Sequence, residues 1–303
     1  MTTHHAAIVG CGYVGSRVAR LWHRRGWRIA VVTRSGNLDL GVREHADEEI
    51  SMHWCDCGAN FRFDRPLDTL LVSVSHRKDP APAAGEVDPP NDHPVGLENI
   101  VSRMPASPRR LIYLSTTGVY APAEDGRAVD EEALCDPQRG GSANAHAAEL
   151  WLQRFADQTP DCEVAILRPA GIYGPGRVPN LQAIRSGETI AAAGDACLNL
   201  IHVDDLAMAI DAIAAGPAPP RHRVYNVSDN SPVTRGDYYA YIARLIDAPP
   251  PHLKASDPAA SVRPRGSGSK RVDSSRILAE YGLALRYPDY RAGLSALLKE
   301  GCY

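Results

Sequence analysis

The sequence lacks long hydrophobic runs, a strong charge of one sign, internal repeats and the short motifs of several enzyme classes. No apolar run approaches the length of a transmembrane helix, and because the first apolar segment predicts a strand, we expect no signal sequence. With 33 Lys and Arg against 36 Asp and Glu, the net charge of −3 gives no reason to expect binding to nucleic acid or to an anionic membrane. Neither a Gly-x-Ser-x-Gly elbow nor a Walker motif occurs, so hydrolase and kinase functions have no support. These absences favour a cytoplasmic protein that acts on a small molecule.

The cysteines do not suggest a disulfide-based fold. There are seven of them, odd in number and scattered along the chain. His53, Cys55 and Cys57 form a local cluster that looks like part of a metal site, but it lacks a second Cys/His pair at zinc spacing. We therefore predict no metal site. With 303 residues and 44% hydrophobic composition, the chain can bury a sizeable core without such help.

The most informative segment is AAIVGCGYVGSRVARL at residues 6–21. Its apolar start predicts a buried strand, its later apolar positions have helical spacing, and its glycines fit the pattern G-x-G-x-x-G. Gly10 would make a tight turn, Gly12 would let backbone approach a pyrophosphate, and Gly15 would allow close packing of helix on strand. The helix N-terminus would favour phosphate, so the segment predicts a dinucleotide site. The residues predicted to contact the dinucleotide here are Gly10, Gly12, Tyr13, Val14 and Gly15.

The end of the second predicted strand, residues 28–33, bears on the choice of cofactor because the ribose 2′ position lies there. An acidic residue at this place would bond the 2′-hydroxyl of NAD, but the chain has Thr33, Arg34 and Ser35. A guanidinium beside a hydroxyl suits a 2′-phosphate. The sequence thus favours NADP(H) and leaves NAD(H) open, since Arg34 as a solvated loop residue is the alternative.

Strand and helix signals alternate through the first half of the chain. Further strands are predicted at 50–54, 69–74 and 111–114, and a helix ends within 97–104. This alternation predicts an α/β fold with a Rossmann-type, doubly wound parallel sheet. The proline-rich segment 75–94 predicts a long loop, either a lid or a mobile surface insertion.

The second half predicts a smaller C-terminal α/β substrate lobe. Proline-rich pieces bracket a strand at 223–227 and a helix at 234–246. We expect residues 1–170 to form the dinucleotide-binding domain and residues 171–303 to form the lobe, interleaved with the first rather than independent.

Six further segments form an ordered pattern. They are LIYLSTTGVY at 111–120, AAELW at 147–151, VAILRPAGIYGPGR at 164–177, NLIHVDDLAMAI at 199–210, VYNVSD at 224–229 and KRVDSSRILAEYGL at 270–283. In this order they resemble the extended short-chain dehydrogenase/reductases, also called the NAD-dependent epimerase/dehydratase family, over essentially the whole chain. The G-x-G-x-x-G turn is similar to that of the atypical, YeeZ-like branch. The resemblance implies the fold predicted above.

The resemblance also exposes a gap. Members of the family act through a Tyr-x-x-x-Lys pair ahead of the AAE motif, in which the tyrosine transfers a substrate proton and the lysine lowers the pKa of that tyrosine. Alignment on Glu149 places Gly141 and Ala145 at these two positions, so both functional groups are absent. None of the four lysines has a tyrosine four residues before it. The resemblance implies that this departure belongs to the branch.

Three side chains remain as candidates for the chemistry. Thr116 occupies the place of the family's catalytic Ser/Thr, whose hydroxyl bonds the substrate oxygen, and the alternative is a strand-end hydroxyl that caps the backbone. Tyr120 is offered by the same loop, with packing as the alternative. His146 follows the vacated lysine position and would exchange a proton near neutral pH. Neighbouring helical positions point about 100° apart, so His146 need not face the site.

The resemblance assigns further positions to the ligands. Asp56 fits an aspartate that contacts the adenine, and the backbone around Pro169 would contact the nicotinamide. Arg177 would meet an anionic substrate, with a surface arginine as the alternative, and His202 would border the substrate pocket. The remaining predicted cofactor contacts are Thr33, Ser35, Ser75 and Ser115.

Two functions stay open. The first is an NAD(P)-dependent oxidoreductase or epimerase in which Thr116 polarises a small carbonyl or sugar-like substrate, and water, a substrate group or a histidine supplies the proton. The second is a non-catalytic NAD(P)-binding sensor or scaffold. Homodimers are common in the family, so a homodimer is the candidate assembly.

Overall fold

The chain forms two compact, interleaved units. The computed structural model describes residues 3–34, 40–75, 92–121, 126–137, 140–217, 222–254 and 269–299. Unit 1 comprises Met1–Tyr120, Cys135–Arg168 and Ala207–Tyr225, and unit 2 comprises Ala121–Leu134, Pro169–Leu206 and Asn226–Tyr303. One crossing between the units falls near the expected boundary at residue 170, and the chain also crosses at four other points.

A seven-stranded sheet forms the centre of unit 1, in the order β12-β7-β5-β4-β1-β2-β3. The pairings from β3 through to β7 are parallel, and the strand order reverses between β1 and β4. This is the doubly wound topology predicted from the sequence, which is thereby confirmed. The strands are β1 (His5–Val9), β2 (Arg28–Thr33), β3 (Glu48–Ser51), β4 (Thr69–Val72), β5 (Arg110–Leu114), β7 (Glu163–Pro169) and β12 (His222–Val227).

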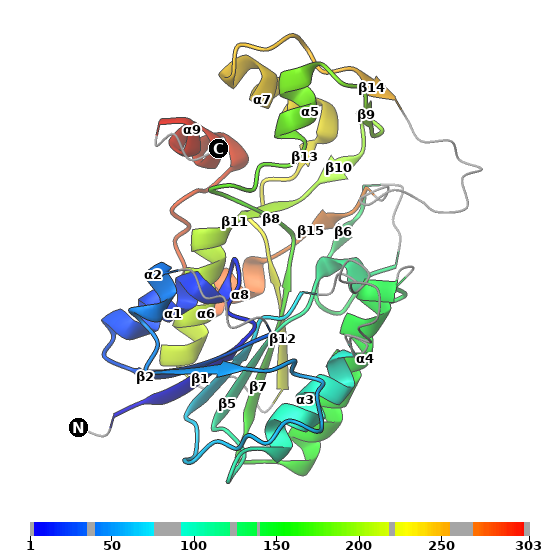
Figure 1. The fold of residues 1–303 in the computed structure, drawn as a ribbon. Helices are drawn as coiled ribbons and strands as arrows, with labels where there is room; N and C mark the ends of the chain where they lie inside the picture. The colour runs from blue at the N-terminus through cyan, green and yellow to red at the C-terminus, as the bar shows by residue number, and fades with distance from the viewer. Residues whose placement is uncertain are drawn as a thin grey trace. The chain divides into compact units, whose positions relative to one another are not determined.

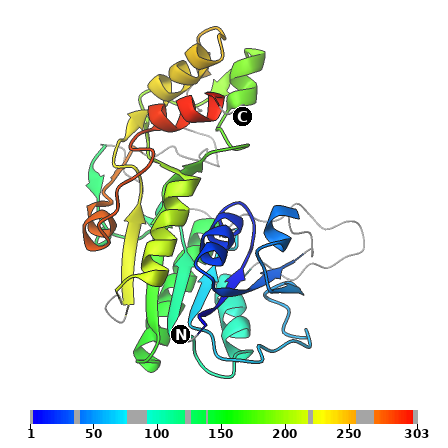
Figure 2. The same ribbon diagram turned by 90° about the vertical axis from the view of Figure 1, so that its left-hand side faces the viewer.

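Helices cover both faces of this sheet. Helices α1 (Gly15–Arg24) and α6 (Val203–Ala215) lie on one face, and α3 (His93–Ser102) and α4 (Gly140–Gln158) lie on the other (Figure 1 and Figure 2). Alternate strand residues point to opposite faces, so both faces of a covered strand are apolar. All five residues of β5 and all four of β4 are accordingly buried. The short helices α2 (Leu40–Arg43) and η1 (Thr117–Val119) complete the elements of unit 1.

The third strand differs from its prediction. We expected residues 50–54, whereas β3 spans Glu48–Ser51 because its register is set by pairing with β2, from Ala30 opposite Glu48 to Thr33 opposite Ser51. Met52 and Trp54 are buried in the core just beyond the strand. Their apolar side chains therefore gave a strand signal at positions that pack without strand geometry.

Unit 2 combines short strands with helices, as expected of a smaller α/β lobe. Its core is rich in tyrosine, with Tyr173, Tyr238 and Tyr290 each at most 2% exposed. None of the described helices has the length and apolar character that a bilayer-spanning segment requires. Its elements are β6 (Ala128–Val129), β8 (Gly171–Tyr173), α5 (Leu181–Ser186), β9 (Ile190–Ala191), β10 (Cys197–Leu198), β11 (Leu200–His202), β13 (Val233–Thr234), α7 (Arg235–Leu245), β14 (Leu253–Lys254), β15 (Arg271–Val272), α8 (Ser275–Glu280) and α9 (Tyr290–Lys299).

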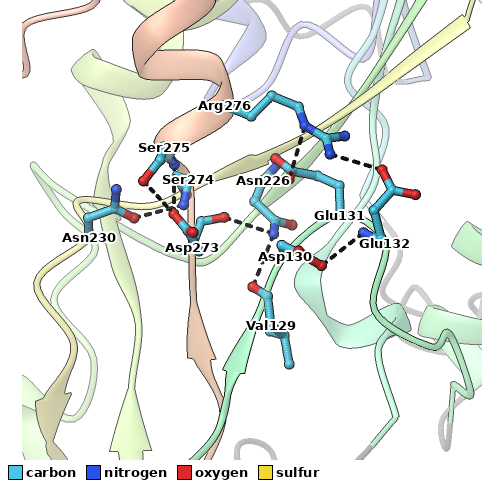
Figure 3. A network of polar contacts seen from close by, with 10 residues as sticks. All are labelled: Val129, Asp130, Glu131, Glu132, Asn226, Asn230, Asp273, Ser274, Ser275 and Arg276. Atoms are coloured by element: carbon cyan, nitrogen blue, oxygen red, sulfur yellow. Dashed lines mark hydrogen bonds and ion pairs between the residues drawn. The ribbon is translucent and has the colours of Figure 1, made fainter.

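A buried polar network joins β6 to β15 in unit 2 (Figure 3). The Asn226 side-chain amide donates to the carbonyl oxygens of Asp273 at 3.0 Å and Val129 at 3.4 Å. The Asn226 backbone N–H donates to Glu131 Oε1 at 2.8 Å, and Arg276 Nε lies 3.4 Å from Glu131 Oε2. Burial raises the pKa of Glu131 despite these partners. One asparagine thus connects three separate segments of the unit.

Candidate active site

The glycine turn after β1 has the shape of a dinucleotide site. Gly10 has a φ of 86°, and a Cβ there would lie 2.8 Å from the backbone of Ser73. A Cβ at Gly15 would lie 2.6 Å from the carbonyl oxygen of Gly10, so helix and turn pack directly on each other. At Gly12, by contrast, no atom of the described residues other than Gly12 and its two chain neighbours lies within 4 Å of the Cβ position. The residues present therefore fit a pyrophosphate, with open space at the predicted point of approach.

The first turn of α1 suits an anion. It contains no acidic residue, and Val14 at the N-cap provides no side-chain cap, so the positive end of the helix dipole is not neutralised by the helix itself. Tyr13 is fixed by Arg17, which donates to the Tyr13 carbonyl oxygen at 2.7 Å and places its guanidinium 4.4 Å from the Tyr13 ring centroid. The turn is thus held in shape by contacts of its own.

The residues predicted to bind the adenosine half lie at the ends of neighbouring strands. Thr33 ends β2, and its buried hydroxyl has no hydrogen-bond partner among the described residues. Arg34 follows and is exposed, while Ser35 lies outside the described residues. Ser75 and Asp56 are also exposed. Their roles toward the cofactor stay predictions, and because β3 ends at Ser51, Asp56 does not lie at the strand end.

Two hydroxyls follow β5 and have different surroundings. Thr116 is half-buried and caps the short helix η1, since its Oγ1 accepts a hydrogen bond from the backbone N–H of Gly118 at 3.1 Å. This is the capping role that we set against a catalytic one, and it leaves the Thr116 hydroxyl proton unused by that contact. Ser115 is buried and donates to Glu149 Oε1. Ser115, predicted to contact the cofactor, therefore points its hydroxyl at a buried carboxylate.

Glu149 is the centre of a buried charge network in unit 1. It lies on the inner face of α4, and Arg168 near the end of β7 donates to it from Nε at 3.0 Å and from Nη2 at 2.7 Å. Glu149 and Arg168 are each 5% exposed. Burial disfavours the charge of Arg168, but its hydrogen bonds to Glu149 raise its pKa above the ordinary value. The guanidinium also lies 4.8 Å from the ring centroid of Tyr120, which is buried. This contact favours the packing alternative for Tyr120.

His146 stands beside the same carboxylate. Its Nδ1 lies 3.6 Å from Glu149 Oε2, one helical turn along α4. Cys135 contributes a third group, because its Sγ, a ring nitrogen of His146 and a carboxylate oxygen of Glu149 all lie within 4.8 Å of one another. His146 therefore faces the polar cluster, which the sequence left undecided. None of the clustered residues His53, Cys55 and Cys57 belongs to this group.

The predicted substrate residues belong to unit 2. Arg177 is exposed and lies in a turn in which its backbone pairs with that of Gly174. His202 is 1% exposed, accepts a hydrogen bond from the Asp204 N–H at 3.2 Å and packs against Tyr173 and Tyr287. Pro169 ends β7. Contacts within unit 2 explain the burial of His202, and the substrate roles of Arg177 and His202 stay predictions.

Comparison with known proteins places the chain in a family. The model of the NAD dependent epimerase/dehydratase family matches residues 6–228. The chain belongs to this family. The epimerase/dehydratase membership predicted from the six ordered segments is thus confirmed.

Individual relatives support the same assignment. Protein YeeZ of Escherichia coli strain K12 is 29% identical over 291 residues, which cover 93% of this chain and 96% of that protein. A functionally unknown conserved protein from Silicibacter pomeroyi DSS is 30% identical, with 99% of each chain covered and a TM-score of 0.75. DesIV, a dTDP-glucose 4,6-dehydratase from Streptomyces venezuelae solved with NAD, has a TM-score of 0.75 at 16% identity, with 98% of this chain and 96% of that chain covered. At that identity the likeness shows the fold.

For an epimerase/dehydratase, this site is notable for two residues that sequence reasoning missed. Glu149 served only to align the AAE motif, although it interrupts the apolar helical face of Ala145, Ala148 and Leu152, a spacing that signals a buried charge. Cys135 gave no such signal, because only the fold brings it to His146. Together with His146 they form one group of ionisable side chains at α4, the helix that carries the vacated tyrosine and lysine positions.

Proposed function

We propose that this chain is an NADP(H)-dependent enzyme that reduces or epimerises a small carbonyl or sugar-like substrate at a non-standard active site. The observation that carries the proposal is the polar cluster after β5, where the Thr116 hydroxyl adjoins the buried network of Ser115, Glu149 and Arg168. In open α/β sheets, ligands bind outside the carboxyl ends of the strands. The glycine turn after β1 and the hydroxyl loop after β5 both lie at such ends. One edge of one sheet thus offers a dinucleotide turn and a polarising hydroxyl.

Thr116 is the proposed polarising group. A bound reduced nicotinamide supplies hydride in this chemistry, and the protein has to orient the substrate and stabilise charge on its oxygen. The Thr116 oxygen already accepts a bond from Gly118, so the hydroxyl proton is directed away from that contact and is available to a substrate oxygen. Loss of one such donor typically lowers turnover by about 100-fold or more.

A screen of aldehydes, ketones and nucleotide sugars with NADPH tests this role. Thr116→Ala should lower turnover of the substrate found by about 100-fold and leave dinucleotide affinity nearly unchanged. Thr116→Ser is the matched control, because it keeps the hydroxyl and should keep most of the turnover. Equal turnover in the wild type and Thr116→Ala would remove Thr116 from the chemistry.

Arg34 carries the proposed preference for NADP(H). It is exposed directly after β2, and neither it nor Thr33 provides the carboxylate that would bind a ribose 2′-hydroxyl. Calorimetric titration of cofactor-stripped protein should therefore show tighter binding of NADPH than of NADH. Arg34→Ala should weaken NADPH by about 10-fold or more and leave NADH unchanged, because only the 2′-phosphate loses its partner. Arg24→Ala, which alters an exposed arginine at the far end of α1, is the control. Equal affinities in the wild type would contradict the preference.

The missing Tyr-x-x-x-Lys pair favours one alternative, a dinucleotide-binding sensor without turnover. A sensor should bind NADPH and leave it unoxidised with every compound of the screen. Oxidation of NADPH by any of them, lowered by about 100-fold in Thr116→Ala, would exclude the sensor. Failure to bind either dinucleotide would exclude both functions.

A further inference from the structure

His146 directly follows a position at which the sequence lacks a proton-transfer group, and a thiol lies close to this imidazole. Gly141 and Ala145 occupy the vacated tyrosine and lysine positions on α4, and His146 is the next residue on the same helix. His146 Nδ1 is buried and has no hydrogen-bond partner among the described residues, although Glu149 Oε2 is only 3.6 Å away. The Cys135 sulfur completes the group within 4.8 Å. All of these residues belong to unit 1.

Backbone hydrogen bonds fix Cys135 at this place. Cys135 forms an isolated antiparallel bridge with Tyr120, and the N–H of Asp136 donates to the carbonyl oxygen of Val119 at 3.0 Å. Val119 and Tyr120 belong to the loop that begins with Thr116, so the thiol is tied to the loop that carries the proposed polarising hydroxyl. Cys135 and His146 are both half-buried, which keeps them open to small reagents.

Glu149 is suited to hold the imidazole. It lies three residues after His146 on α4, so the two side chains share a face of the helix. Ser115 and Arg168 fix the carboxylate, and its Oε2 is the oxygen that faces His146. An imidazole held in this way can take the proton of a neighbouring thiol, which leaves a thiolate beside an imidazolium. Activated cysteines have this arrangement, in which a base adjoins the nucleophile and a third group orients the base.

We propose that Cys135 and His146 form a thiol–imidazole couple that exchanges the proton in this site, with Glu149 as a positioning residue. The acid–base role rests on the proposed function. In the reducing direction, an N–H bond of the His146 imidazolium breaks and its proton forms an O–H bond with the substrate oxygen, while the carbonyl carbon receives the hydride of the bound reduced nicotinamide. Water then reprotonates His146, and in the oxidising direction the proton of the substrate hydroxyl returns to the couple. Cys135 and His146 would thus supply the proton-transfer groups that Gly141 and Ala145 lack.

A metal ion is the competing occupant of the three donor atoms, since Zn²⁺ accepts thiolate, imidazole and carboxylate ligands. Arg168 argues against it. Its Nε and Nη2 donate to the two oxygens of Glu149, so a full positive charge already lies beside the place that a cation would take. An imidazolium carries one positive charge and therefore meets less of this repulsion than a divalent ion does. Among the described residues, the titratable groups near the couple include Glu149 on α4, Arg168 on β7, Tyr113 on β5, Tyr120 after η1, His222 on β12, and Asp136 next to Cys135 in the chain.

Alkylation by iodoacetamide tests the couple without any substrate. The thiolate sulfur attacks the methylene carbon, a C–S bond forms and iodide leaves, so the rate at each pH follows the thiolate fraction. Peptide mass spectrometry then gives a separate pH profile for each cysteine. We expect half-maximal alkylation of Cys135 below about pH 7.5. Cys197 is the internal control: it is also half-buried, but burial raises its pKa, so its profile should lie above the ordinary value of about 8.5.

His146→Gln should move the Cys135 profile upward by about one pH unit or more, because the neighbouring cation is lost, and should leave Cys197 unchanged. Circular dichroism checks that the variant is folded, and His146→Asn serves if it is not. A Cys135 profile at or above the ordinary value, or one that His146→Gln leaves in place, would overturn the proposal. So would bound zinc whose removal by a chelator speeds alkylation. Because no turnover is needed, a low Cys135 profile would stand even if the proposed enzymatic function failed.

Discussion

Replacing Glu149 by glutamine tests whether a buried charge pair holds the candidate site together. Glu149 and Arg168 are each 5% exposed, and Arg168 donates to both carboxylate oxygens, at 3.0 and 2.7 Å. Glu149→Gln leaves the buried guanidinium without a counter-charge. Removing one partner of a buried pair costs about 3–5 kcal/mol, so we expect a loss of that size in the free energy of unfolding. At about 2 °C per kcal/mol for a chain of this size, the Tm should fall by roughly 6–10 °C.

Urea and thermal unfolding followed by circular dichroism measure this loss. The control is Asp64→Asn, which breaks the exposed pair with Arg65 in the same unit and should leave both midpoints unchanged. The double variant Glu149→Met with Arg168→Met should recover at least half of the loss, because no charge then stays buried. A loss below about 1 kcal/mol in Glu149→Gln would equal that of a surface ion pair and would refute the reasoning from burial.

Three further outcomes follow from other parts of the chain. Gly12→Ala should leave the Tm unchanged and weaken dinucleotide binding in calorimetry. Gly10→Ala should lower both the Tm and the dinucleotide affinity, because a Cβ at Gly10 meets backbone and a Cβ at Gly12 does not. Burial raises the pKa of Asp229 to about 7, above its unfolded value of about 4, so stability present at low pH is lost as the pH rises through about 7. Asp229→Asn should flatten that part of the pH profile of urea unfolding, and an unchanged slope would contradict the assignment. Asn226→Ala removes two buried side-chain hydrogen bonds and should cost about 1–3 kcal/mol by the same measurement; an unfolding midpoint equal to that of the wild type would show that the amide does not hold the network.

The sequence predicted correctly those elements whose conformation is determined by neighbouring residues in the chain. The turn at Gly10 requires a positive φ, and the sequence placed a glycine there, so β1 and α1 were predictable. The third strand was placed too late because Met52 and Trp54 are apolar for reasons of packing, while the register is decided by partners on β2. In most strands the buried residues and the residues that form ladder hydrogen bonds span the same range, whereas at β3 the buried residues continue past the last paired residue.

The candidate site was less predictable because its members come from distant segments. Thr116 and His146 could be named from their places in the ordered motifs, but the orientation of His146 depends on Glu149, and the burial of Glu149 depends on Arg168, nineteen residues further along the chain. Cys135 reaches the group through its backbone bridge with Tyr120 and through the hydrogen bond of the next residue, Asp136, to Val119. A single sequence records neither pairing.

The order in which the chain is made matters for its sheet. The edge strand β12 covers β7, yet it is translated long after it, and Arg110 on β5 donates to the carbonyl oxygens of Ala214 and Gly216, at 3.0 and 3.3 Å, which are also made late. A nascent chain that has reached residue 170 would therefore carry β7 as a bare edge and Arg110 without these acceptors. Bare edges pair with other chains and seed aggregation. While the chain between β7 and β12 is being synthesised, protection by a chaperone or rapid translation would therefore matter most. A recombinant fragment that ends at residue 170 would keep the edge of β7 exposed permanently.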